Sequence, residues 1–245
     1  MTTALILAAG TASRLRPLTN DRPKCLLRIG ERSLLQRSID ALLDNGIREL
    51  VVVTGYRGEM IERFVGEHYA GRLSVTTILN ERYATTNNIY SLWLARKAVE
   101  GKEVLLLDSD LVYDPEIVTR VLAHPAENVL TLIRHELGEE EMKVVTNNEG
   151  AITEISKTCR PADAAGESLG IEKMSPSYTR ALYAELEGMM EREGLENKFY
   201  ELAFERLIPQ GHTFTVLDVS DLFSCELDTV EDFEQARNKI PPTLF

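Results

Sequence analysis

Strand-length apolar runs alternate with longer amphipathic segments along the first half of the chain. Runs bounded by turn residues indicate buried strands, which we predict at residues 4–8, 50–54, 74–79 and 103–107. Apolar residues at helical spacing predict helices at residues 33–45, 59–69 and 88–99, and Asp114-Pro115 starts a further helix. This alternation is typical of an α/β fold with a doubly wound, mostly parallel sheet of the Rossmann-like type.

After about residue 128 the pattern becomes richer in strands. We predict strands at residues 129–134, 142–146, 151–156, 169–174 and 213–218, with a hairpin turn at 147–150. Helices are predicted at residues 176–192, 198–207 and 228–239. We interpret residues 128–175 as a small β-rich insertion that covers the functional site of a single domain.

The first predicted strand opens into a turn of small residues with cations after it. Gly10 lets the backbone pass close to a ligand, and successive backbone N–H groups in such a turn can face a phosphate chain. Arg14 offers a planar fork and Lys24 a point charge, which together suit a triphosphate. The turn lacks the Gly-Lys-Ser/Thr of a Walker loop and the Gly-x-Gly-x-x-Gly of a dinucleotide fold. The segment therefore predicts a nucleotide site of another kind.

Two aspartates are candidate metal ligands. Asp110 follows a predicted strand, at the edge of the sheet where ligands of such folds bind, and Asp108 competes with it. Asp228 opens the last predicted helix, where a capping box with Glu231 would explain it equally well. Two carboxylates with room for water and phosphate oxygens suit Mg²⁺.

Composition excludes several classes of partner. The 245 residues carry a net charge of −12, which argues against nucleic acid and against anionic membrane surfaces. The three cysteines form no metal-ligand spacing and no disulfide framework, so a reduced, cytoplasmic setting fits. The apolar N-terminal run is too short for a signal peptide or a membrane span. The sequence leaves open whether the protein forms a homo-oligomer.

Two segments resemble a known family. The residues around Leu5–Thr19, with Arg22-Pro23-Lys24-Cys25-Leu26-Leu27, resemble the signature of the nucleoside-triphosphate transferases, which include the sugar-nucleotide pyrophosphorylases and cytidylyltransferases. The string Asn87-Asn88-Ile89-Tyr90-Ser91-Leu92 resembles a segment of the bacterial phosphocholine and phosphonate cytidylyltransferases. The resemblance implies Mg²⁺-dependent transfer of CMP from CTP to a small phosphate or phosphonate acceptor, with release of pyrophosphate. A sugar-1-phosphate or inositol-phosphate nucleotidyltransferase is the alternative, and an inactive nucleotide-binding regulator is another.

The resemblance also implies roles for individual residues, with a nucleotide-binding half at 1–127 and an acceptor-binding half at 128–245. The implied nucleotide-binding residues are Leu7, Ala8, Ala9, Gly10, Thr11, Arg14, Lys24, Gly55, Asn87, Asn88 and Ser109. Asp110 and Asp228 are the implied metal ligands. Catalysis is implied for Arg14, Lys24 and Lys157. The implied acceptor-binding residues are Lys157, Glu167, Tyr200 and Glu201.

One departure from the phosphocholine enzymes concerns the aromatic cage that holds quaternary ammonium. The two positions aligned with cage aromatics carry Met142 and Ala203, and the single tryptophan, Trp93, lies in the helix of the double asparagine, where we expect it to be packed. We therefore expect a smaller amine, such as 2-aminoethylphosphonate, or a hydroxyalkylphosphonate to be a better acceptor than phosphocholine.

Overall fold

The central strand of the sheet is β1 (Thr3–Ala8), whose side chains are all buried. Its neighbours pair with it in parallel, β4 on one side and β6 on the other, so the parallel core agrees with the prediction. The computed structural model describes residues 1–244, and in it the strands run β10-β9-β11-β6-β1-β4-β5, with β8 paired to β11 and β12 paired to β8. The bounds of the other strands of this sheet are β4 (Glu49–Thr54), β5 (Ser74–Leu79), β6 (Val104–Asp108), β8 (Val129–Ile133), β9 (Lys143–Thr146), β10 (Ile152–Ser156), β11 (Gly166–Met174) and β12 (Thr215–Asp218).

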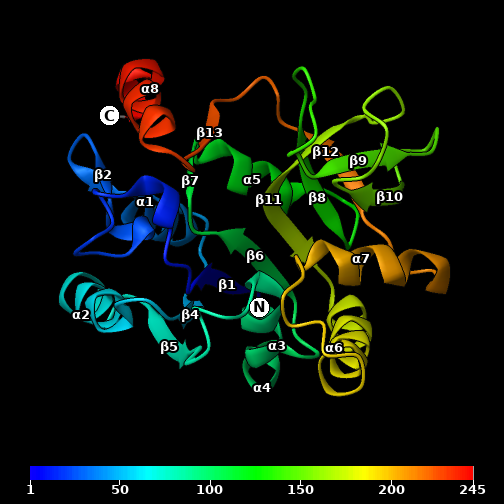
Figure 1. Cartoon of the computed structure of the whole chain (residues 1–245), viewed down its shortest axis with the longest axis horizontal. Helices are drawn as coiled ribbons and strands as arrows, with labels where there is room; N and C mark the ends of the chain where they lie inside the picture. The colour runs from blue at the N-terminus through cyan, green and yellow to red at the C-terminus, as the bar shows by residue number, and fades with distance from the viewer. Residues whose placement is uncertain (245) are drawn as a thin grey trace.

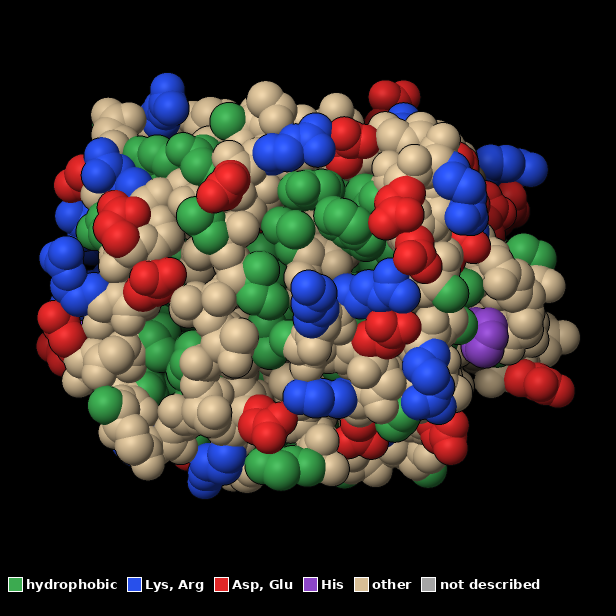
Figure 2. Space-filling view, turned by 90° about the horizontal axis from the view of Figure 1, so that it is seen from below, with side chains coloured by type: hydrophobic (Ala, Val, Ile, Leu, Met, Phe, Trp, Pro, Cys, Tyr) green, Lys and Arg blue, Asp and Glu red, His purple; other side chains and the backbone are tan. Residues whose placement is uncertain are grey.

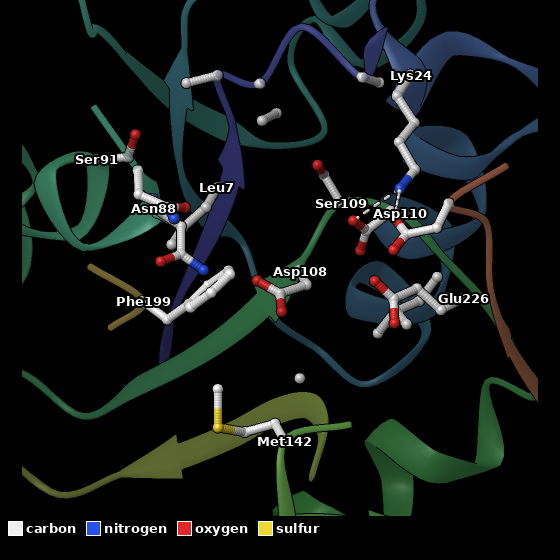
Figure 3. Close-up of a pocket in the computed structure, with 18 of the residues that line it drawn as sticks. Leu7, Lys24, Asn88, Ser91, Asp108, Ser109, Asp110, Met142, Phe199 and Glu226 are labelled. Carbon is white, nitrogen blue, oxygen red and sulfur yellow. Dashed lines mark hydrogen bonds and ion pairs between the residues drawn. The ribbon is translucent and has the colours of Figure 1, made fainter. Parts of the chain in front are cut away.

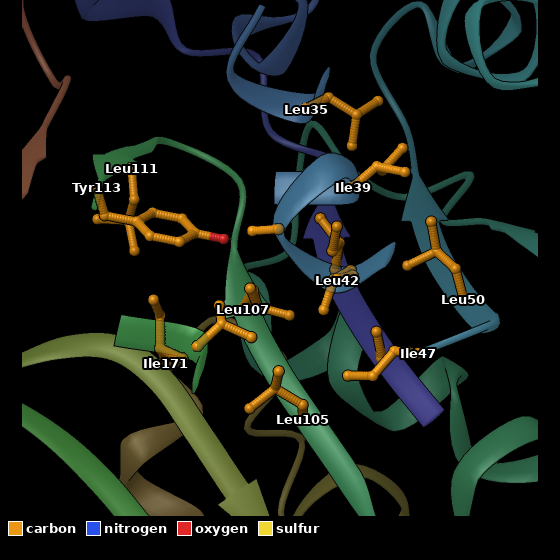
Figure 4. Close-up of a cluster of buried hydrophobic side chains, with 14 of the residues drawn as sticks. Leu35, Ile39, Leu42, Ile47, Leu50, Leu105, Leu107, Leu111, Tyr113 and Ile171 are labelled. Carbon is orange, nitrogen blue, oxygen red and sulfur yellow. The ribbon is translucent and has the colours of Figure 1, made fainter. Parts of the chain in front are cut away.

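Helices cover both faces of the sheet, and alternate residues of β1 reach the two cores (Figure 1). Ile6 packs in the core with α1, α2 and α5, whereas Leu5 packs in the core with α3, α6 and α7. Figure 4 shows the first core, in which Ile39 and Leu42 of α1 lie over the sheet. The helix bounds are α1 (Leu34–Asp44), α2 (Gly58–Tyr69), α3 (Asn88–Leu94), α4 (Arg96–Val99), α5 (Glu116–Ala123), α6 (Pro176–Glu191), α7 (Glu201–Leu207) and α8 (Val230–Lys239).

The β-rich segment after residue 128 is continuous with the sheet. Strand β11 pairs antiparallel with β6, which makes the sheet mixed, and it also pairs with β8 and β9. The predicted hairpin joins β9 to β10. In Figure 1 these strands gather on the far side of β6 from the N-terminal helices.

The helices differ from the prediction in several details. The helix predicted at 88–99 divides at Ala95 into α3 and α4, and α7 begins at Glu201 because residues before it form turns. The capping box of α8 uses Thr229 and Asp232 rather than Asp228 and Glu231, so the prediction was wrong by one residue. The side chain of Asp228 is thereby free of the cap and pairs with cations instead.

Two short ribbons were not predicted. Strands β2 (Arg28–Ile29) and β3 (Arg32–Ser33) form one, and β7 (Leu111–Tyr113) pairs antiparallel with β13 (Ser224–Glu226) in the other. The second ribbon follows β6 directly and brings the segment before α8 to the carboxyl end of the sheet.

Charged side chains of both signs lie on the surface. Figure 2 shows one face, on which basic and acidic side chains are interspersed. No helix among residues 1–244 has the length and apolar composition needed to cross a bilayer.

Candidate active site

A cavity of about 780 Å³ lies where β1 and β6 end, between the first half of the chain and β11 (Figure 3). Because β1 and β6 are parallel neighbours, their carboxyl ends open at the same edge of the sheet. The predicted site residues that line the cavity are Leu7, Ala8, Ala9, Gly10, Arg14, Lys24, Asn87, Asn88, Ser109, Asp110, Lys157, Glu167, Glu201 and Asp228. Thr11, Gly55 and Tyr200 do not line it.

The turn after β1 forms one wall. Gly10 lines the cavity, and a Cβ placed on it would meet no protein atom within 4 Å. The residue with a left-handed backbone is Ala12, with φ of 45°, and its carbonyl accepts a 2.9 Å hydrogen bond from the Thr19 hydroxyl. The turn is therefore held in shape by the loop that follows it.

Three carboxylates converge at one end of the cavity. Asp110, Glu226 and Asp228 each offer an oxygen, and these oxygens lie within 4.8 Å of one another. The β7–β13 ribbon makes this possible, because it pairs Glu226 with Leu111, the residue after Asp110. Carboxylate oxygens are hard ligands of the kind that Mg²⁺ and similar cations prefer, so the group has the chemistry of a divalent metal site.

Two cations from the segment after β1, where we predict that phosphate binds, pair with these carboxylates. Lys24 Nζ lies 3.0 Å from Asp110 Oδ2 and 2.9 Å from Asp228 Oδ1, and Arg14 Nη2 lies 2.6 Å from Asp228 Oδ2. Burial lowers the pKa of Lys24, but the two aspartates outweigh burial and raise it above its ordinary value. Burial and the neighbouring aspartates raise the pKa of Glu226 to about 8. The predicted residues of the phosphate and metal site are thus brought together.

The double asparagine lies on the opposite wall, at the start of α3. The side chain of Asn87 accepts a hydrogen bond from the backbone N–H of Asn88. Asn88 Oδ1 in turn accepts one from the backbone N–H of Tyr200 at 3.0 Å. The Nδ2 group of Asn88 remains for the cavity, which Asn88 lines. Gly55, just after β4, packs instead against the turn that follows β1, where an added Cβ would lie 2.5 Å from the Ala9 carbonyl oxygen. The structure therefore assigns Gly55 a packing role, because only a glycine fits against that turn.

The other end of the cavity carries one lysine among acidic residues. Lys157 Nζ lies 4.7 Å from the centre of the Phe199 ring and 3.7 Å from Glu140 Oε2. Glu167 Oε2 lies 2.6 Å from His135 Nε2. Of the two positions considered for a cage, Met142 lines the cavity but Ala203 is fully buried in the α7 core, so Ala203 is not a cage position.

Buried acids form the floor of the cavity from its middle to the Lys157 end. Asp108 and Glu201 line the cavity, and Glu172 is fully buried behind them. Burial and nearby carboxylates hold the pKa of Asp108 well above its ordinary range, and burial raises that of Glu201 to about 7. Oε2 of Glu201 has no hydrogen-bond partner among residues 1–244. Tyr200, expected to contact the acceptor, is fully buried and donates its hydroxyl to Asp108 Oδ2 at 3.2 Å.

Comparison with known proteins identifies the family. The residue pattern that defines the nucleotidyl transferase family matches residues 3–155. The chain belongs to that family. As a nucleotidyltransferase, it is a member of an enzyme family that uses a divalent metal ion, for which the carboxylates of Asp110, Glu226 and Asp228 form a fitting site.

Individual relatives span most of this nucleotidyltransferase. The CMP-5'-(3-aminopropyl)phosphonate synthase of Streptomyces rubellomurinus is 28% identical over 98% of this chain, which spans only 39% of that longer protein. The CTP:phosphoglutamine cytidylyltransferase of Campylobacter jejuni is 26% identical over 94% of this chain and 97% of its own. The structure of CTP:phosphocholine cytidylyltransferase from Streptococcus pneumoniae has a TM-score of 0.80 at 20% identity, covering 98% of this chain and 99% of that one. This last likeness shows the fold.

Sequence reasoning missed two residues of the nucleotidyltransferase site. Glu226 lies two positions before Asp228, a spacing that places both side chains on one face of an extended segment. Phe199, 42% exposed, is the aromatic ring next to Lys157 in the cavity. Its only sequence signal is its position before Tyr200 and Glu201.

Proposed function

We propose that this nucleotidyltransferase is a cytidylyltransferase, which transfers CMP from CTP to a small phosphonate or phosphate acceptor and releases pyrophosphate. The observation that carries the proposal is a single cavity with two chemically different ends. One end holds Lys24 and Arg14 beside the carboxylates suited to a metal, and the other holds Lys157 among acids. The names of the relatives support it, because each contains CMP or CTP and a phosphorus-containing acceptor or product.

We assign the metal role to Mg²⁺. Asp110, Glu226 and Asp228 would hold it, since their oxygens converge and are of the type that Mg²⁺ accepts. When bound, the ion supplies charge that polarises phosphoryl oxygens. Lys24 and Arg14, already beside the same carboxylates, bring two further positive charges to the phosphate loop.

The reaction needs no protein nucleophile. An oxygen of the acceptor phosphate or phosphonate attacks the α-phosphorus of CTP in line, a new P–O bond forms, and the bond to pyrophosphate breaks. Such a transfer depends on positioning and on neutralising charge. In the proposal, Arg14 holds the β- and γ-phosphates, Lys24 stabilises charge on the α-phosphate, and Lys157 aligns the attacking group.

The acceptor end favours a body that carries an amine. Glu201 offers an unpartnered, buried carboxylate oxygen, and Asp108 lines the same floor. A primary ammonium can donate hydrogen bonds to such oxygens, which choline cannot. Phe199 is the aromatic ring beside Lys157 at this end, and Met142 lines the cavity where a cage aromatic was considered, so we propose 2-aminoethylphosphonate or a similar small amine over phosphocholine.

The proposal is tested by pyrophosphate release with the purified protein, Mg²⁺ and CTP. The acceptors are 2-aminoethylphosphonate, a hydroxyalkylphosphonate, phosphocholine, glucose-1-phosphate and inositol-1-phosphate. We expect the amine phosphonate to give the highest kcat/KM. A preference for a sugar or inositol phosphate would establish the alternative function, and a tenfold preference for phosphocholine would overturn the description of the acceptor end.

We further propose that residues 1–245 form one nucleotidyltransferase domain, with nucleotide binding by the first half and acceptor binding by residues 128–245. The division follows the cavity, because the phosphate loop and α3 belong to the first half, and Lys157, Glu167 and Glu201 belong to the second. Glu226 and Asp228 are the exceptions, since the segment before α8 brings these two carboxylates back to the nucleotide end.

A further inference from the structure

Tyr200 connects two walls of the cavity, although Tyr200 itself does not line the cavity. Its amide donates to Asn88 Oδ1 at 3.0 Å, and its hydroxyl donates to Asp108 Oδ2 at 3.2 Å. Its side chain is fully buried and packs against Phe204 with ring centres 5.2 Å apart. One residue of the acceptor half therefore bonds to the start of α3 and to the end of β6.

The hydroxyl of Tyr200 fixes the orientation of the Asp108 carboxylate. The same oxygen lies against Gly170, where an added Cβ would come 2.5 Å from Asp108 Oδ2. Asp108 Oδ2 thus accepts the tyrosine hydroxyl at a place where only a glycine leaves room for it. In Figure 3 Asp108 lies near the middle of the cavity, between Asn88 and Phe199 on one side and Glu226 on the other.

Tyr200 also fixes Glu201, because it is the residue immediately before α7. The bond from its amide to Asn88 holds the first turn of α7 against the first turn of α3. The segment before α7 is tied to the same place, since the Asn87 amide donates to the Glu196 carbonyl at 2.8 Å. The position of Glu201 in the cavity depends on this attachment.

We propose that Tyr200 is a positioning residue that sets Asp108 and Glu201 as the two carboxylates that receive the acceptor. The inference rests on the proposed function, because it assumes that this end of the cavity holds the acceptor. In this proposal Tyr200 does not contact the acceptor itself, because its side chain is fully buried. Asp108 thereby gains a role separate from the metal carboxylates.

The test compares Tyr200→Phe with Tyr178→Phe. Tyr178 is also fully buried, but its hydroxyl has no hydrogen-bond partner within residues 1–244, so its removal breaks no such bond. With CTP and 2-aminoethylphosphonate, Tyr200→Phe should raise the acceptor KM about tenfold, since it removes a hydrogen bond to a carboxylate. The KM for CTP should change less than about twofold, and Tyr178→Phe should leave both values unchanged. Equal effects of the two variants would overturn the proposal.

Asp108→Ala supplies the second arm. If Tyr200 acts through Asp108, adding Tyr200→Phe to Asp108→Ala should change the acceptor KM no further. The same cycle is measured by urea unfolding, in which Tyr200→Phe should lower the midpoint of the wild type but not that of Asp108→Ala. Equal midpoint shifts in both backgrounds would overturn the positioning role. Absence of turnover with CTP and every acceptor would instead overturn the proposed function, and the unfolding cycle would still decide the role of Tyr200.

Discussion

At the scale of single residues, the charge on Lys24 is central to the proposed transfer. It is nearly buried and lies within 3.0 Å of two aspartates beside the phosphate loop. Removing one preorganised charge from such a site costs on the order of 10²–10³ in rate. We expect Lys24→Ala to lose that much in kcat while it folds normally. Arg22→Ala is the matched control, because Arg22 lies in the same loop but pairs with exposed Asp21. Near-normal turnover of Lys24→Ala would refute its role.

Glu201 predicts a dependence on pH. Burial raises its pKa from 4.5 to about 7, with Lys157 opposing that shift, and Glu172 is its buried acidic neighbour. An ammonium acceptor binds the ionised carboxylate, so kcat/KM for 2-aminoethylphosphonate should rise with pH through about 7. Glu201→Gln should abolish this rise and should affect a hydroxyalkylphosphonate less. A Glu201→Gln profile with the same rise would contradict the assignment.

The same group should affect stability. Between pH 4.5 and about 7 the unfolded state has Glu201 ionised while the folded state keeps it protonated, so the folded protein binds more protons. The free energy of unfolding contributed by this group therefore falls as pH rises through that window. In urea unfolding, the free energy of unfolding of Glu201→Gln should fall less with rising pH than that of the wild type. An equal fall in the two proteins would contradict the burial of the Glu201 carboxyl.

At the scale of elements, the β7–β13 ribbon assembles the metal carboxylates from distant segments. Asp110→Asn and Asp228→Asn should each raise the Mg²⁺ concentration needed for half-maximal turnover. Because both serve one ion, the double variant should be little worse than the more severe single one. Fully additive losses would indicate separate roles for the two aspartates.

Strand β11 gives a prediction at Gly170. Gly170 and Gly150 both have a left-handed backbone, with φ of 82° and 79°, but only Gly170 faces an atom that a Cβ would strike. Gly150→Ala should cost about 1–2 kcal/mol of stability from backbone strain alone. Gly170→Ala should cost more and should also raise the acceptor KM, because it displaces Asp108. Equal unfolding midpoints for the two variants would contradict the close contact.

The elements also show how much the sequence could predict. Long periodic segments such as α1 and buried runs such as β1 were predicted within about one residue, because one regular pattern determines each. The β7–β13 ribbon was missed because its strands are short and their pairing joins residues far apart in the chain. Glu226 was missed with it, since only that pairing places it beside Asp110.

At the scale of the whole molecule, one cavity is built from both halves of the chain, and we propose that nucleotide and acceptor meet there. Resemblance to a family indicated which residues gather there, and most of them do line the cavity. It could not separate residues that face the cavity from those just behind it. Gly55 and Tyr200 were expected among the binding residues, and they pack against Ala9 and Phe204 without lining the cavity. Whether a residue lines the cavity or lies just behind it depends on contacts between distant segments, which a local sequence pattern does not reveal.

The central claim is that the transferred nucleotide is CMP. It is tested most directly by comparing kcat/KM for CTP and UTP, with 2-aminoethylphosphonate as acceptor and pyrophosphate release as the readout. The two bases differ at one edge, an amine against a carbonyl, and a site that accepts a hydrogen bond from that amine leaves a polar group unpaired when uracil binds. We predict that CTP is preferred by at least about tenfold, which corresponds to about 1.4 kcal/mol. Equal efficiency with the two nucleotides would contradict the claim.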